Sequence, residues 1–198
     1  MQRLIMILFT FALCQSTAHS ATINLPASGQ TKCYDTAGTE IASCAGTGQD
    51  GDKKMGVTWD EATRFSDNGN GTITDTLTGL IWLQNASCFG TKVWADALTS
   101  ANTLASGVCG LSDSSSAGQW RLPTRKELKS LVNRGVPNSA TWLGTKGFST
   151  VQANYYWSSS SYANNTNLAW VVEMRYGYID NGNKPYINYY VWPVRAGQ

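Results

Sequence analysis

The order of helical and strand patterns along the chain constrains its fold more than any other feature. Apolar residues recur at helical spacing from Trp94 to Ala105, which predicts a helix of about three turns. A second helix is predicted to begin after Thr124, because Thr124 and Glu127 can form a capping box ahead of an apolar stripe. Gly135 is expected to end that helix in a left-handed conformation.

Strand patterns lie before and after these helices. Residues 64–83 contain short β-prone runs split by Asn-Gly and Thr-Gly turns, which predict a hairpin or meander. After the second helix, β-prone runs occur at residues 155–158, 168–174 and 189–194, joined by Gly-rich and Asn-rich loops. Helices and strands that segregate along a chain, instead of alternating, predict an α+β fold and not a parallel α/β sheet.

The N-terminus has the pattern of a secretory signal peptide. Arg3 precedes an apolar run from Leu4 to Leu13, and small and polar residues follow as far as Ser20. The run is too short to cross a bilayer, and no later segment has the roughly 20 apolar residues that a membrane span needs. We therefore expect residues 1–20 to be removed and the mature protein to be secreted or periplasmic.

Cleavage after Ser20 would remove Cys14 and leave an even number of cysteines. In an exported protein the remaining four are expected to form disulfides, and three pairings are possible. Sequence proximity favours a Cys33–Cys44 bridge and a Cys88–Cys109 bridge. Residues 21–56 are rich in Gly, Thr, Ala and Asp, so we predict a disulfide-clamped N-terminal segment there and one domain over residues 57–198.

The composition excludes several function classes. Cleavage would also remove His19, the only histidine, so a Ser-His-Asp or Cys-His centre and a His-ligated metal site cannot form. The near-neutral net charge does not favour nucleic-acid binding. Catalysis would have to rest on carboxylates, but no spacing singles out a facing pair, so a glycoside hydrolase is a minor alternative to a non-enzymatic protein.

A cluster of oxygen-bearing side chains at residues 67–71 suggests a calcium site or a turn. Asp67, Asn68 and Asn70 could offer oxygen ligands to a hard cation. However, Gly69 and Gly71 occupy the positions where the next ligands of an EF-hand loop are required, and a tight turn between strands explains the same residues. We therefore predict a turn and no metal or cofactor, with calcium as the alternative.

Several motifs occur in an order that is specific to one family. They are Phe65–Asp75 (FSDNGNGTITD), Leu77–Trp82 (LTGLIW), Trp94 with Ala97-Leu98, Trp120–Thr124 (WRLPT) with Glu127-Leu128, Tyr156–Ser159 (YWSS), Ala169-Trp170 and Val191–Gly197. In this set the chain resembles the Lcl C-terminal domain family. The resemblance implies a C-type-lectin-like fold, with two helices packed on a twisted antiparallel sheet and long ligand-binding loops.

The resemblance also implies a binding function. In a bacterial collagen-like adhesin of this family, the C-terminal domain binds sulfated polysaccharides of host surfaces. This chain has no Gly-X-Y repeat, so trimerisation is not implied and the oligomeric state is left open. We expect a secreted bacterial binding protein whose partner is a polysaccharide or surface glycan. A cell-surface protein partner is the alternative, including a lectin-like receptor of the kind diversified by retroelements.

The C-terminal third holds the candidate ligand-binding residues. Residues 154–190 contain eight of the nine tyrosines and half of the asparagines, and Tyr and Asn together are typical of binding loops. Trp157, Trp170 and Trp192 are expected in the core. The residues predicted to bind ligand are Tyr162, Asn164, Asn165, Arg175, Tyr176, Tyr178, Asn181, Asn183, Tyr186 and Asn188. The alternative is that the asparagines only close turns and the tyrosines only line the sheet.

Basic residues around the second helix suggest a further contribution to binding. Arg125 and Lys129 are one helical turn apart and could present a cationic stripe to sulfate groups. The alternative is an ordinary solvated helix face opposite Leu128 and Leu131. Arg121, which lies between two apolar residues, is expected to be structural.

Overall fold

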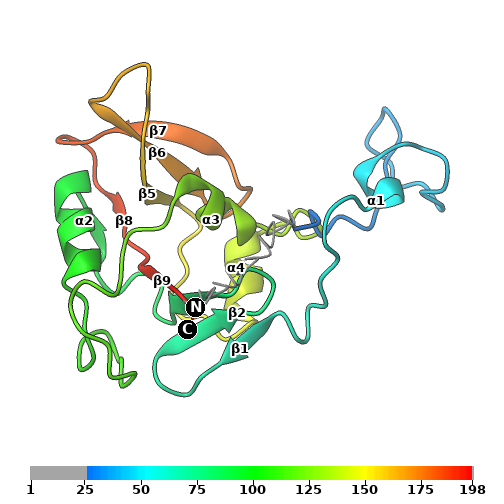
Figure 1. The fold of residues 1–198 in the computed structure, drawn as a ribbon. Coiled ribbons are helices and arrows are strands. Elements are labelled where there is room, and N and C mark those ends of the chain that lie inside the picture. Colours follow the sequence, from blue (N-terminus) through cyan, green and yellow to red (C-terminus); the bar gives the residue numbers. More distant parts are fainter. Residues whose placement is uncertain (1–25, 198) are drawn as a thin grey trace, which may run out of the picture.

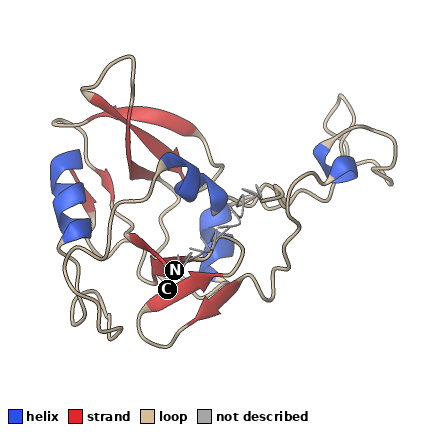
Figure 2. Ribbon diagram, viewed as in Figure 1, coloured by secondary structure: helices blue, strands red, loops and turns tan. Residues whose placement is uncertain are grey.

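The computed structural model describes residues 26–197 (Figure 1). The predicted signal peptide, residues 1–20, lies outside the described residues. No helix among residues 26–197 is long and apolar enough to cross a membrane. The described elements make a mixed α+β structure with short helices, strands and long loops, as Figure 2 shows. The α+β prediction is confirmed.

The N-terminal segment carries one short helix, α1 (Asp50–Lys53), and the Cys33–Cys44 disulfide. In Figure 1 this helix and the loops around it project away from the sheets. The base of the segment is tied down by Pro26, which bridges to Val57, and by the Arg134 amide, which donates to the Ser28 carbonyl at 2.7 Å. The boundary at residues 56 and 57 stays a prediction.

Residues 65–83 form the predicted meander, which continues into a four-stranded sheet. Strands β1 (Phe65–Asp67), β2 (Thr72–Asp75) and β3 (Leu80–Leu83) pair antiparallel in sequence order. The last strand, β9 (Val194–Ala196), adds to the outer edge of β3. The C-terminus therefore completes a sheet that begins near residue 65, so the sheet cannot close until nearly the whole domain has been synthesised.

The other strands form a five-stranded sheet in the order β4-β8-β5-β6-β7. The bounds are Thr91–Lys92, Tyr189–Tyr190, Tyr155–Ser161, Leu168–Glu173 and Ile179–Asn183 in that spatial order. β5 and β8 pair in parallel and the other neighbours antiparallel. The expectation of a single antiparallel sheet is wrong, because β8 reaches β5 by a crossover and then leaves it to feed β9 in the first sheet.

Helix α2 (Trp94–Asn102) and helix α3 (Arg125–Ser130) lie where the sequence predicts helices. The α3 capping box is present: the Thr124 hydroxyl accepts from the Glu127 amide at 3.2 Å, and the Glu127 carboxylate accepts from the Thr124 amide at 2.7 Å. Gly135 does not end the helix. The helix ends at Ser130 with Leu131 at φ −75°, and Gly135 instead packs closely against the backbone of Gly29.

A helix that sequence periodicity missed, α4 (Ser139–Gly144), follows α3. The Asn138 side chain caps it by accepting from the amides of Ala140 and Thr141, and the helix buries Trp142 and Leu143. The expectation that only strands follow the second predicted helix is therefore wrong. A helix of this length shows less than two turns of apolar spacing, which is too little for a periodicity argument.

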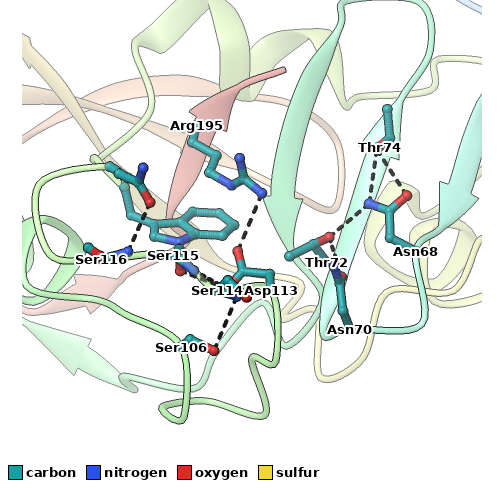
Figure 3. Close-up of polar contacts among 12 residues, drawn as sticks. Asn68, Asn70, Thr72, Thr74, Ser106, Asp113, Ser114, Ser115, Ser116 and Arg195 are labelled. Atoms are coloured by element: carbon teal, nitrogen blue, oxygen red, sulfur yellow. Dashed lines mark hydrogen bonds and ion pairs between the residues drawn. The ribbon is translucent and has the colours of Figure 1, made fainter. Parts of the chain in front are cut away.

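The loop between α2 and α3 is held by a disulfide and a polar network. The Cys88–Cys109 bridge ties it to the β3–β4 connection, so both bridges that sequence proximity favours are present. The buried Asp113 carboxylate accepts from the Ser115 hydroxyl at 2.7 Å and lies 3.4 Å from the Arg195 guanidinium (Figure 3). Ser115 in turn accepts from the Trp120 ring nitrogen at 2.9 Å. The network fixes this loop against β9.

Two apolar clusters lie on the two faces of the five-stranded sheet. The larger contains Leu128, Tyr156 and Val172, and it extends to the four-stranded sheet through Trp82 and Trp192. The smaller contains Ala97 and Ala101 of α2 with Trp157, Val171 and other residues. Residues alternate faces along a strand, so α3 covers the face of Val172 and α2 covers part of the face of Val171.

Candidate ligand-binding surface

Helix α3 carries the basic residues, and a hydrogen-bonded carboxylate fixes its first turn. The Arg121 guanidinium donates to both oxygens of Glu127, at 2.8 and 2.6 Å, while Glu127 holds the capping box. Burial acts to raise the pKa of Glu127, but the hydrogen bonds from Arg121 and the Thr124 amide outweigh it and keep the pKa below its usual 4.5. Arg121 is structural, as expected.

This pKa shift predicts a pH-dependent stability. Because the pKa of Glu127 is lower in the folded protein, its contribution is fully present above pH 4.5 and is lost as the pH falls through the folded value. We expect Glu127→Gln to reduce the free energy of unfolding by about 1 kcal/mol at neutral pH and by less near pH 3, which lies below the unfolded value of 4.5. Urea denaturation at both pH values measures the difference. Glu40→Gln, which removes an exposed partner of Lys32, should cost little at either pH.

Arg125 stacks on an aromatic pair at the start of α3. Its guanidinium carbon lies 4.5 Å from the centre of the Trp170 ring, and the Tyr162 ring meets Trp170 edge-on at 5.0 Å. Trp170 is only half-buried, so the prediction that it belongs to the core is wrong, whereas Trp157 and Trp192 are fully buried. Trp170 faces the same side as Val172 but lies nearer the start of β6, where Arg125 covers it in place of an apolar side chain.

The other end of α3 holds the turn between β6 and β7. The Lys129 ammonium donates to the Gly177 carbonyl at 2.6 Å, and the Arg134 guanidinium donates to the Tyr176 carbonyl at 2.5 Å. Burial, with the nearby Arg134 charge, lowers the pKa of Lys129 below its usual 10.5. Gly177 has φ +70° and packs against Val132, so a side chain at this position would collide with the Val132 side chain, just beyond the end of α3. The turn is therefore anchored to α3.

An open groove runs between α3 and the base of the N-terminal segment, with a volume of about 570 Å³. Four cationic side chains and one carboxylate line it: Arg125, Lys126, Lys129, Arg134 and Asp50. Met55 and Ile179, both exposed, add apolar surface. We call this the basic groove. Its surplus of positive charge makes it suited to an anionic ligand.

A second hollow, of about 440 Å³, lies next to the basic groove. It is lined by Arg134, Arg175, Tyr176 and Tyr178, among others, so Arg134 belongs to both hollows. Tyr176 and Tyr178 are 42% and 60% exposed, and their ring centres are 5.6 Å apart. The structure thus brings together five of the residues predicted to bind ligand: Arg125, Lys129, Arg175, Tyr176 and Tyr178.

The loops that carry most of the remaining predicted residues lie at the opposite end of the sheet. The loop with Tyr162, Asn164 and Asn165 joins β5 to β6, and the loop with Tyr186 and Asn188 follows β7; Figure 1 places both away from the β6–β7 turn. Successive connections of an antiparallel sheet emerge at alternate ends, so the Tyr/Asn-rich segment cannot form one continuous surface. The prediction of a single Tyr/Asn surface is wrong, and the candidate residues form two groups.

Several of the asparagines have local structural roles. The Asn165 side chain accepts from the Asn167 amide at 3.2 Å, and the Asn183 carbonyl accepts from the amides of Tyr186 and Ile187. Asn181 is half-buried on β7, opposite Trp170. Asn164 and Asn188 are exposed, and Tyr186 is 80% exposed. The turn-closing alternative therefore holds for the Asn165 side chain, whereas at Asn183 only the backbone carbonyl closes the turn. Tyr186 remains free to contact a partner.

Residues 67–71 form a tight turn. The Asp67 carboxylate accepts from the Gly69 amide at 2.8 Å, and Asn68 and Asn70 bond to the hydroxyls of Thr72 and Thr74 (Figure 3). Gly69 and Gly71 both have positive φ. Residues 26–197 contain no group of three or more His, Cys, Asp or Glu side chains that could hold a metal ion. Turn geometry accounts for the oxygen-rich cluster.

The fold and the surface define a disulfide-bonded α+β domain that displays a cationic groove beside exposed tyrosines. The Lcl C-terminal domain family matches residues 71–195, and the chain belongs to this family. No curated protein matches the chain. The resemblance inferred from the ordered motifs is confirmed.

Proposed function

We propose that this protein is an exported, non-enzymatic binding protein that recognises a sulfated or otherwise anionic polysaccharide. The observation that supports this proposal most directly is the basic groove. Its lining has a single carboxylate, that of Asp50, and four cations, those of Arg125, Lys126, Lys129 and Arg134. Two disulfides support an oxidising destination. Family membership supports a binding role and a C-type-lectin-like fold, in which the loops and helices beside the sheet present the ligand surface.

Within the groove, the cations differ in their freedom to bind. Lys129 and Arg134 already donate to backbone carbonyls, and they retain further N–H groups for a ligand. Arg125 is held flat on Trp170, which presents its guanidinium edge for bidentate contact with a sulfate. Lys126 is exposed. Tyr176 and Tyr178 extend the surface beyond Arg134 and offer ring faces for stacking on sugars.

Three carboxylates of the domain are engaged in structure. Asp75 is fully buried against Arg64, Glu127 holds the capping box, and Asp67 closes a turn. These three carboxylates are therefore not free to act as a catalytic pair. The exposed tyrosines favour a second candidate, recognition of a cell-surface protein through Tyr176, Tyr178 and Tyr186.

The test uses the mature chain on a panel of sulfated, carboxylated and neutral polysaccharides at low and high salt. We expect binding to sulfated polymers that weakens steeply with salt. Arg125→Ala combined with Lys126→Ala should weaken it by about tenfold or more, because each change removes a charge-assisted contact. These two residues are chosen because neither makes the backbone contacts of Lys129 and Arg134.

A matched control removes two positive charges elsewhere. Lys32→Ala with Lys92→Ala changes the net charge equally but leaves the basic groove intact, so it should keep most of the affinity. If both double variants weaken binding equally, the groove is not the site. If no polysaccharide binds at either salt concentration, the glycan proposal fails and recognition of a protein by the exposed tyrosines becomes the better account.

A further inference from the structure

The face of the five-stranded sheet opposite α3 carries a second group of aromatic and acidic residues. Tyr155 on β5 pairs with Glu173 on β6, and the Glu173 amide donates to the Tyr178 carbonyl at 2.9 Å. Asp180, two residues beyond Tyr178, pairs with Val171. Because residues two apart share a face, Tyr155, Glu173, Tyr178 and Asp180 all belong to the Val171 side, which α2 covers only in part.

A third aromatic residue, Tyr189, joins this group from β8. The Tyr189 ring lies 5.4 Å from the Tyr155 ring and meets Trp157 edge-on at 4.9 Å, centre to centre. Gly182 makes this packing possible, since a side chain there would collide with the rings of Tyr189 and Trp157. Tyr155 and Tyr189 are half-buried, so each packs against the sheet with one part and is open to solvent with another. We call Tyr155, Tyr178, Tyr189 and Asp180 the tyrosine–aspartate face.

The charge of this face is negative. Asp180 is exposed, and one of its carboxylate oxygens accepts from the Asn181 amide, while the other accepts no hydrogen bond within residues 26–197. Burial first, and then the Asp180 charge, raise the pKa of both Tyr155 and Tyr189, which keeps their hydroxyls protonated. Glu173 adds a second carboxylate, which accepts from the Tyr176 amide at 2.6 Å.

Two lysines share this side of the sheet, but neither neutralises Asp180 with an ion pair. Lys184 lies at the far end, 4.1 Å from the centre of the Trp94 ring, and its ammonium donates to Ser161 and to the Thr166 carbonyl. Lys92 is on β4, opposite Tyr189. Asp180 is therefore an exposed carboxylate without an ion-pair partner among the described residues, whereas the basic groove has a surplus of cations.

We propose that the tyrosine–aspartate face is a second binding site, which takes a protonated amino sugar of a glycan. The adjacent rings of Tyr155 and Tyr189 provide an apolar surface for the C–H face of a pyranose. The free oxygen of Asp180 accepts from the sugar ammonium, and the ring faces attract the same cation. The site shares no residue with the basic groove, although Tyr178 also lines the second hollow beside that groove. The inference does not depend on the proposed function.

The phenol groups favour a sugar over a simple organic cation as the occupant. The hydroxyls of Tyr155, Tyr178 and Tyr189 make no hydrogen bond to any protein group within the described chain, although each can donate one and accept others. A lysine side chain or a quaternary ammonium would use the carboxylate and the ring faces but not these hydroxyls. An amino sugar offers a ring face, a cation and several hydroxyls together.

The test compares two oligosaccharides that differ mainly in charge. One is an oligomer of glucosamine and the other is the same oligomer with every amine acetylated, both titrated calorimetrically into the mature protein at a pH where the free amine is protonated. We expect the glucosamine oligomer to bind at least tenfold more tightly, because acetylation removes the cation. Asp180→Asn, which keeps the side-chain shape, should remove most of that preference, and Tyr155→Ala should weaken the binding of both oligomers.

Controls separate this site from the basic groove. Glu40→Gln removes an exposed negative charge from the N-terminal segment and should leave amino-sugar binding unchanged. Arg125→Ala with Lys126→Ala should also leave it unchanged, while Asp180→Asn should leave the binding of sulfated polymers unchanged.

Three results would overturn the proposal. Equal affinity for the two oligomers would mean that the cation is not recognised, and unaltered binding by Asp180→Asn would remove the site from this face. Binding of polylysine that depends on Asp180, without binding of the glucosamine oligomer, would assign the face to a cationic protein instead. Circular dichroism of each variant distinguishes loss of contact from loss of fold.

Discussion

Asp75→Ala is expected to destabilise the protein by about 3–5 kcal/mol, because it leaves a buried arginine without its counter-charge. The Arg64 and Asp75 side chains are 1% and 0% exposed, and the guanidinium donates to both carboxylate oxygens at 3.1 and 3.0 Å. It also donates to the Ser130 carbonyl at 2.7 Å, at the end of α3. The pair thus joins the meander to the helix that lines the basic groove.

A comparison of single and double variants separates the ion pair from the loss of packing. We expect Arg64→Met with Asp75→Ala to cost less than the sum of the two single changes, since no unpaired charge remains. Asp96→Ala removes an exposed carboxylate from the first turn of α2 and should change stability by no more than about 0.5 kcal/mol. Urea denaturation followed by tryptophan fluorescence gives all four values. If the double variant loses as much stability as the two single variants together, the two charges do not act as a pair.

Local sequence signals predicted the local structure well. The capping box of α3 depends only on Thr124 and Glu127, three residues apart, and it is present. The disulfides join the cysteines that are nearest in sequence, with separations of 11 and 21 residues. The Asn-Gly turns of the meander depend on two glycines with positive φ, and the motif order identified the family. In each case the interacting groups are close in sequence or belong to one ordered pattern.

Features that depend on strand order were not predictable in the same way. Pairing of β3 with β9 joins residues more than 100 positions apart, and no local pattern encodes that choice. The same holds for the binding residues. Tyr176 and Tyr186 belong to the same Tyr/Asn-rich segment, but they lie at opposite ends of the sheet because β7 separates them. Asp180, Tyr155 and Tyr189 meet only through the register of four strands, so composition alone could not group them.

The basic groove shows how local and long-range information combine. Arg125 and Lys129 were predictable as a stripe from their spacing on one helix. The sequence could not predict what this stripe faces, because the groove also includes Asp50 and Met55 of the N-terminal segment and Ile179 of β7. Nor does the sequence indicate that Lys129 holds the β6–β7 turn. The stripe is therefore both a candidate ligand surface and a structural support for the neighbouring tyrosines.

Trp192→Ala is expected to destabilise the protein by about 3–5 kcal/mol, the usual cost of removing a buried tryptophan. Trp192 is fully buried between β8 and β9, at the point where the chain passes from one sheet to the other. Its ring lies 5.4 Å from Trp82 of the four-stranded sheet and 5.4 Å from Tyr156 of the five-stranded sheet. The ring nitrogen donates to the Leu83 carbonyl at 2.8 Å.

Because Trp192 packs against both sheets, removal of its side chain should weaken the connection between the sheets and also leave a cavity in the core. Trp192→Phe retains an aromatic ring but not the hydrogen bond to Leu83, and should cost about 1–3 kcal/mol. Tyr186→Ala removes an aromatic ring that is 80% exposed and should cost less than about 0.5 kcal/mol. Denaturant unfolding of the three variants, with hydrogen exchange at β3 and β5, measures both effects. A loss of protection confined to β9 would contradict the bridging role, since a residue that joins two sheets must expose strands of both when it is removed.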